Sequence, residues 1–105
     1  MASVYTKNFF SSTVAPGTPQ GFMTGASSET WILRSLLMTV ATSGFGWSVN
    51  ITDGAGNLIY QSGIQAVSTL AVENLRVVLQ PSTSYTISAG TDSVFVSVDG
   101  YVLSS

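Results

Sequence analysis

SVFVSVDGYVL, residues 93–103, decides the fold, because apolar and polar side chains alternate along it with a period of two. Successive side chains of a β-strand point to opposite faces, so the alternation assigns each residue to a face. One face carries the valines: Val94, Val96, Val98 and Val102. The other face carries Ser93, Phe95, Ser97, Asp99 and Tyr101. Gly100 interrupts the valine face and predicts a bulge or a close approach of another backbone there.

Shorter segments of the same kind recur along the chain, separated by clusters of Gly, Pro, Asn, Asp and Ser. The predicted strands are 3–10, 20–24, 30–42, 47–52, 58–61, 75–80, 84–89 and 93–103. The predicted hairpins join 20–24 with 30–42, 47–52 with 58–61, and 84–89 with 93–103. Residues 63–73 fit neither the two-residue period of a strand nor the 3.6-residue period of a helix, and they predict an irregular strand or a crossover. About eight strands in 105 residues predict one all-β domain, an antiparallel β-sandwich of jelly-roll-like form.

Charged residues make up only 8% of the chain, against roughly 25% in an ordinary soluble domain. The cations Lys7, Arg34 and Arg76 are too few and too scattered to neutralise a run of phosphates, so we expect no nucleic-acid partner. The same sparsity, together with the lack of an apolar stretch of about 20 residues, argues against a membrane partner. The N-terminal residues carry no recognisable signal peptide, so we expect synthesis in a cytoplasm.

The residue types also restrict catalysis. The chain has no Cys and no His, which excludes thiolate chemistry, His-based acid–base chemistry and Cys/His zinc sites, and we expect no cofactor and no metal. A glycosidase would need two carboxyl groups about 5 to 10 Å apart. The carboxylates are Glu29, Asp53, Glu73, Asp92 and Asp99. Asp53 and Asp92 fall in predicted turns, where Asp commonly bonds its own backbone, so we predict a protein that is not an enzyme.

The turn DGAGN, residues 53–57, has oxygen ligands beside glycines and is superficially similar to a calcium loop. It lacks the alternating acids and the terminal Glu of an EF-hand loop. We therefore interpret it as a hairpin turn.

Arg34 is unusual because it lies within the most apolar predicted strand, 30–42. That strand is apolar on both faces, so we expect a central strand covered on both sides. Alternation places Arg34 on the face of Ile32, Leu36 and Met38, where a buried guanidinium requires an acidic partner or several acceptors. The intrachain partners would be Glu29, Glu73 or Asp99. The alternative is an ion pair across a subunit interface, and the two hypotheses stay open.

The large aromatic residues allow two interpretations. They could form sugar-stacking platforms, although core packing is the more common role of large rings at alternating positions. The residues concerned are Trp31, Trp47, Tyr60 and Tyr101. With so little charge, a monomer would expose extended apolar and Ser/Thr-rich surface, which is typical of an interface, so we predict a homo-oligomer. The residues that we expect at an interface are Phe9, Phe10, Arg34 and Tyr101.

Four stretches together resemble small virion proteins of tailed bacteriophages. They are YTKNF (5–9), ETWILRS (29–35), VVLQP (77–81) and VSVDGYVL (96–103). The resemblance implies a small jelly roll or β-sandwich on a particle surface, often trimeric, that serves as a capsid decoration (cement) protein, a head fibre or a minor tail protein. It implies a location in the virion, with the major capsid protein or other virion proteins as partners, and it supplies no catalytic residues.

We therefore predict a structural protein that oligomerises and stabilises a phage head by bridging capsid subunits. Residues 1–19 are the predicted docking arm, because an extended segment can add a strand to the edge of another chain's sheet. The alternative is a receptor- or carbohydrate-binding component of a tail or fibre.

Overall fold

The computed structural model describes residues 3–40, 47–63, 70–90 and 92–104, and every regular element in these ranges is a β-strand. The strands are β1 (Ser3–Val14), β2 (Gln20–Met23), β3 (Glu29–Val40), β4 (Val49–Thr52), β5 (Leu58–Gln61), β6 (Leu70–Leu79), β7 (Ser84–Ala89) and β8 (Val94–Ser104). No helix in these ranges is long and apolar enough to cross a membrane. The all-β prediction is confirmed.

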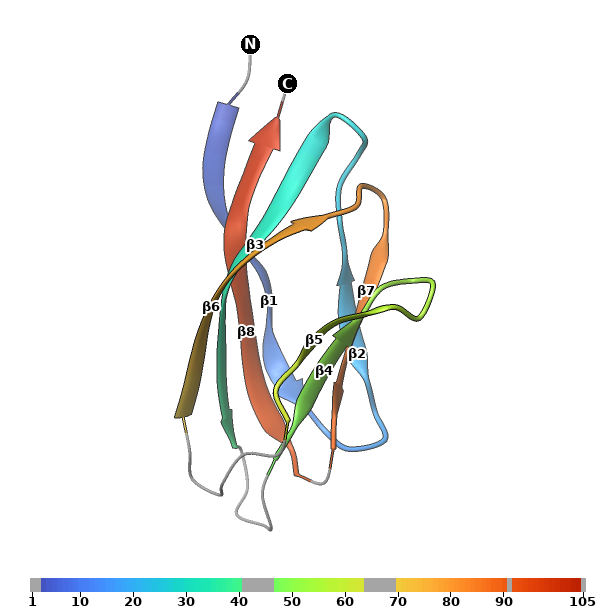
Figure 1. The fold of residues 1–105 in the computed structure, drawn as a ribbon, viewed down its shortest axis with the longest axis vertical. Helices are drawn as coiled ribbons and strands as arrows, with labels where there is room; N and C mark the ends of the chain where they lie inside the picture. The colour runs from blue at the N-terminus through green and yellow to red at the C-terminus, as the bar shows by residue number, and fades with distance from the viewer. Residues whose placement is uncertain (1–2, 41–46, 64–69, 91, 105) are drawn as a thin grey trace.

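The strands form two four-stranded antiparallel sheets that pack face to face (Figure 1). Sheet I has the order β1-β8-β3-β6, and sheet II has the order β2-β7-β4-β5. Most connections carry the chain from one sheet to the other, and the first and last strands are neighbours in sheet I. This is the arrangement of an eight-stranded jelly roll, as the sequence predicted.

The predicted pairing of neighbouring segments is correct in one of three cases. β4 and β5 form the expected hairpin. The hairpin of 20–24 with 30–42 is wrong, because β2 pairs with β7 in sheet II while β3 lies in sheet I. The hairpin of 84–89 with 93–103 is wrong for the same reason, since β8 pairs with β1 and β3. Side-chain alternation assigns faces of a strand and carries no information about its neighbours.

Two predicted boundaries also shift. β1 continues to Val14, so residues 11–14 extend the first strand instead of beginning a connection. β6 begins at Leu70, inside the segment 63–73 that fitted neither period, and residues 64–69 lie outside the described residues.

The core lies between the sheets and is built on the valine face of β8. All four valines are 0% exposed, which confirms the predicted alternation. Sheet II contributes Val49, Ile51, Tyr85 and Ile87 from the opposite side, and Trp47, just before β4, joins them. β3 and β6 contribute Trp31, Leu33, Leu36, Met38 and Leu79.

Two β-bulges face the same point of β8. In β1, Phe9 is the extra residue between the pairs Asn8↔Asp99 and Phe10↔Val98. In β3, Arg34 is the extra residue between Leu33↔Gly100 and Ser35↔Asp99. A bulge places two residues of one strand opposite one residue of its neighbour and so interrupts the alternation of faces.

The bulge in β3 overturns the predicted burial of Arg34. Leu33 and Leu36 are both 0% exposed on the core side, although their spacing would put them on opposite faces of a regular strand. Arg34 is exposed on the other side of sheet I. A buried partner for its guanidinium is therefore not required, and the placement of Arg34 with Leu36 and Met38 was wrong.

Gly100 marks the place where β8 is crowded from both neighbouring strands. A Cβ atom at this position would collide with the carbonyl oxygen of Ile32 and would lie 2.9 Å from two ring carbons of Phe9. The close approach that the sequence predicted at Gly100 is confirmed, and bulges lie in both strands that flank it.

Gly100→Ala is expected to destabilise the domain by about 1–3 kcal/mol, because the added methyl group must displace backbone or the Phe9 ring. Urea unfolding followed by tryptophan fluorescence measures the change. Gly54→Ala is the matched control, since its Cβ would meet only the Ser84 carbonyl oxygen, at an ordinary 3.6 Å. Equal stabilities of the two variants would contradict the crowding.

Candidate functional site

The outer face of sheet I carries an unusual number of apolar side chains. Cross-strand partners project to the same face, and Tyr101, Ile32 and Val78 form one such row. Leu37 and Val72 form a second row, next to Phe95. We call these residues the outer patch: Ile32, Leu37, Val72, Val78, Phe95 and Tyr101.

The outer patch is partly open to solvent. Val72 is 56% and Val78 58% exposed, whereas Ile32, between Tyr101 and Val78, is only 7% exposed. Sheet II packs on the opposite face of sheet I, and no described element lies over the outer patch (Figure 1). An antiparallel sheet with one solvated face normally has polar side chains on that face. The position of β3 as a central strand is confirmed, but the described residues cover only one of its faces.

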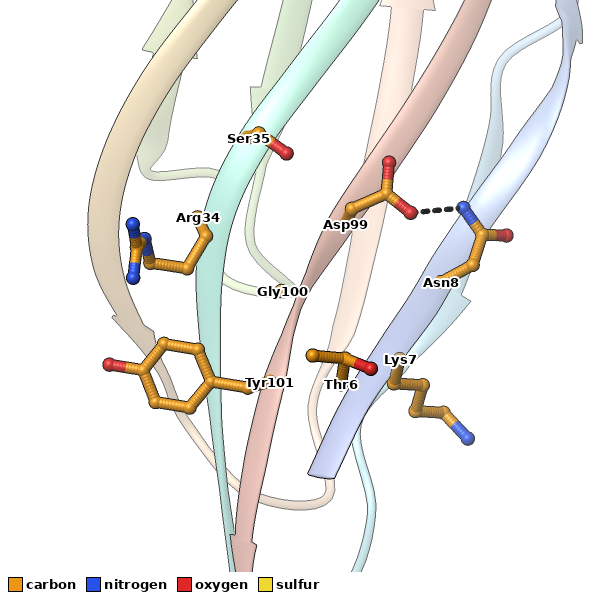
Figure 2. A pocket seen from close by; sticks show the side chains of 8 residues that line it. All are labelled: Thr6, Lys7, Asn8, Arg34, Ser35, Asp99, Gly100 and Tyr101. Carbon is orange, nitrogen blue, oxygen red and sulfur yellow. Dashed lines mark hydrogen bonds between the residues drawn. The ribbon is translucent and has the colours of Figure 1, made fainter. Parts of the chain in front are cut away.

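A polar row divides the outer patch at the level of the two bulges. It runs through Asn8, Asp99, Ser35 and Asn74, which are registered across all four strands of the sheet. A shallow depression of about 410 Å³ lies here (Figure 2). Its lining consists of Thr6, Lys7, Asn8, Arg34, Ser35, Asp99, Gly100 and Tyr101. Arg34 and Tyr101, both predicted interface residues, therefore share one site.

The Arg34 guanidinium lies over the Tyr101 ring, 5.8 Å from its centre. Figure 2 shows both side chains directed toward the same side of the depression. Among the described residues Arg34 forms no ion pair, so its charge is balanced only by the ring and by solvent.

Asp99 is held by neutral donors on the other side of the depression. The Asn8 amide donates to Oδ1 at 2.8 Å (Figure 2), and the Ser97 hydroxyl donates to Oδ2 at 3.1 Å. The same amide nitrogen lies 3.2 Å from the Phe10 carbonyl oxygen and 3.4 Å from that of Val98, beside the bulge in β1. With two N–H hydrogens, the Asn8 amide therefore fixes the carboxylate and can serve one of the carbonyl groups beside the irregular ladder.

At pH 7, Asn8→Asp is expected to lower the free energy of unfolding by about 1 kcal/mol more than Asn8→Ala does. The reason is that it places a second carboxylate beside Asp99 and beside carbonyl oxygens. The repulsion acts only while both carboxyl groups are charged. The excess cost is therefore present at neutral pH and is lost as the pH falls below about 4. Urea unfolding at both pH values measures it, and a pH-independent difference would contradict this role of Asn8.

Phe9 and Phe10 lie on the core side of sheet I. Phe9 is 8% exposed and stacks on Trp31 with ring centres 4.7 Å apart, and Phe10 packs half-buried against the core. They are separated from Arg34 and Tyr101 by the thickness of the sheet. The interface role of these four residues stays a prediction, but only Arg34 and Tyr101 line the depression.

The two tryptophans are core residues. Trp31 is 8% and Trp47 1% exposed, so neither offers an open ring face for a sugar. Tyr60 is half-buried in β5, where burial and then the negative charge of Glu73 raise the pKa of its phenol to about 12. Tyr101 is therefore the one predicted stacking residue that lines the depression.

Two further carboxylates are occupied by local contacts. Glu29 accepts hydrogen bonds from the Trp31 indole at 3.0 Å and from the Tyr5 hydroxyl at 3.4 Å. Asp53 accepts hydrogen bonds from the backbone N–H groups of Ala55 and Asn57, both at 2.9 Å, and its contacts with Asn57 lower the pKa of its carboxyl. The hairpin-turn interpretation of residues 53–57 is confirmed.

No protein-family model and no curated protein sequence matches the chain. Solved structures do match. A chain of infectious bursal disease virus, Gx strain, is 18% identical with a TM-score of 0.56, and the match covers 98% of this chain and 32% of the virus chain. This chain thus spans about a third of the virus chain.

Two other matches span nearly the whole of both proteins. A chain of the Bacillus endospore appendages, a family of disulfide-linked pili, is 14% identical with a TM-score of 0.62, and the match covers 100% of this chain and 90% of that chain. The NLP core of Drosophila, a structure concerned with pentamer formation and histone binding, is 11% identical with a TM-score of 0.56, covering 91% and 98%. At these identities the likeness shows a shared β-sandwich fold.

Proposed function

We propose that this chain is a non-enzymatic structural subunit of a virion, a capsid decoration protein that oligomerises and bridges capsid subunits. The observation that carries the proposal is the outer patch, an apolar sheet face that no described element covers. A surface of this kind marks a protein that functions in contact with other chains. The bacteriophage character rests on the resemblance in the sequence.

The fold supports a role in assembly. The virus and spore-appendage structures are assembled particles or fibres, and the Drosophila structure concerns a pentamer. The appendages are described as disulfide-linked, whereas the residues of this chain include no Cys and so form no disulfide. The open outer patch and the likeness to subunits of assemblies both support oligomerisation. The resemblance in the sequence implies a trimer.

The surroundings of the acidic groups support a non-enzymatic role. Glu29 bonds an indole, Asp53 closes a turn and Asp99 is held by Asn8 and Ser97. These contacts give the three carboxylates structural tasks, and the chain has no His or Cys to assist them.

Docking on a capsid would use the edge of β1. Residues 3–14 are an edge strand of sheet I, paired with β8 on one side only. An edge strand presents unpaired N–H and C=O groups to which a strand of another chain can add. The predicted arm 1–19 is therefore proposed to act through this edge, with the strand in place in the domain.

Virions assembled with the gene for this chain deleted provide the test. Purified protein is expected to bind them saturably, at a fixed ratio to the major capsid protein, and to raise the temperature at which the heads release DNA. Co-sedimentation with quantitative mass spectrometry measures the ratio, and heat-denatured protein is the control. Absence of this chain from purified wild-type virions, or failure to bind the deleted particles, would contradict a decoration role.

The alternative, carbohydrate or receptor binding, is favoured by one observation: Tyr101 borders a polar depression. Binding on a glycan array that disappears in Tyr101→Ala and persists in Tyr60→Phe would support it in place of capsid decoration. Both Trp residues are buried and would not serve such a site.

A further inference from the structure

We infer that the outer face of sheet I is the self-association surface, and that its occupant is the same face of a second copy of this chain. The inference rests on the proposed function and names the surface and the partner that the function requires. It concerns the contact between subunits, whereas docking on a capsid was assigned to the edge of β1.

The size of the face fits such a contact. Sheet I has four strands, and β8 is eleven residues long. At about 4.8 Å between strands and about 3.3 Å per residue, the face covers roughly 700 Å². A standard stable interface takes about 800 Å² from each partner. A second copy presenting the same face would therefore bury an area close to that of a stable interface.

The distribution of apolar and polar side chains on the face is also that of a protein interface. The outer patch occupies β8, β3 and β6, while the outward-facing positions of β1 carry the polar residues Thr6, Asn8, Ser11 and Thr13 and, at its start, the exposed Val4. An apolar centre with a polar rim is the usual anatomy of a protein interface. Val72 and Val78, which are 56% and 58% exposed on the edge strand β6, would gain cover that the described residues do not supply.

The face carries one positive and one negative group that can pair between two copies, which favours a second copy as the partner. Arg34 projects from β3, and Asp99 lies on the neighbouring strand β8 at the same level of the face. The guanidinium forms no ion pair among the described residues, and the carboxylate is met only by Asn8 and Ser97. A two-fold symmetry axis parallel to the strands, over the middle of the face, sets the β3–β6 half of one copy against the β1–β8 half of the other. Arg34 of each copy then faces Asp99 of its neighbour.

Light scattering on a sizing column, at micromolar protein, tests the inference. The wild-type chain is expected at twice the mass of one chain, and not at the three times that the resemblance implies, because a face that packs on the same face of a second copy closes as a dimer. Val78→Asp and Arg34→Asp are expected to weaken the association by at least about tenfold and to elute as monomers, because each buries an unpaired or repelled charge at the contact. Arg34→Lys, which keeps the charge, is expected to retain most of the association. Circular dichroism establishes that each variant is folded.

Leu58→Asp is the matched control. Leu58 is 52% exposed, close to the 58% of Val78, but it lies on β5 in sheet II, so its variant is expected to keep the wild-type mass. A monomeric wild-type chain would overturn the inference. An unchanged mass in both Val78→Asp and Arg34→Asp would also overturn it, as would a Leu58→Asp variant that dissociates as much as Val78→Asp. Binding of the wild-type chain to particles that lack it is a separate readout, so failure of the self-association surface is distinguishable from failure of the decoration role.

Discussion

The close approach of β1 and β3 to Gly100 is the constraint on which the rest of sheet I depends. β8 lies between these two strands, and at Gly100 the Phe9 ring and the Ile32 carbonyl group occupy the space of a side chain. Each neighbouring strand carries an extra residue beside this point. On the core side the bulge in β1 turns the Phe9 ring onto Trp31. On the outer side the bulge in β3 turns Arg34 outward next to Tyr101. One crowded position thus shapes both the core and the outer surface.

This arrangement links the fold to assembly. A regular β3 would place Arg34 and Leu36 on the same face, so either the guanidinium would be buried or Leu36 would be exposed, whereas the bulge buries Leu36 and leaves Arg34 on the outer side. The polar row through Asn8 and Asp99 crosses the outer patch, and the charges of Asp99 and of Arg34 beside it can set the register between copies. Polar groups within an apolar contact are known to specify alignment at some cost in stability. The outer face therefore combines apolar area for affinity with charges for orientation.

Much of this structure follows from the sequence, and the failures have a common physical cause. The alternation in 93–103 correctly identified the buried valines, and Gly100 on the valine face correctly indicated crowding. The burial of Arg34 was wrong because a bulge in one strand is fixed by the partner strand, which alternation does not reveal. The hairpins of β2 with β3 and of β7 with β8 were wrong because short loops that cross between sheets resemble hairpin loops in sequence. The outer patch was partly foreseeable, since 30–42 is apolar on both faces, but its extension to Val72 and Val78 required the pairing of β3 with β6.

The central claim is that the outer face of sheet I is buried when the protein assembles. The chain has no Cys, so one introduced thiol reports the accessibility of one position. The most direct measurement is the rate at which a maleimide labels Val78→Cys and Leu58→Cys, each within the assembled protein and each as a monomer at high dilution. The account predicts that assembly slows labelling of Val78→Cys at least about tenfold and leaves Leu58→Cys unchanged. Equal rates for Val78→Cys in the assembled and diluted protein would contradict it.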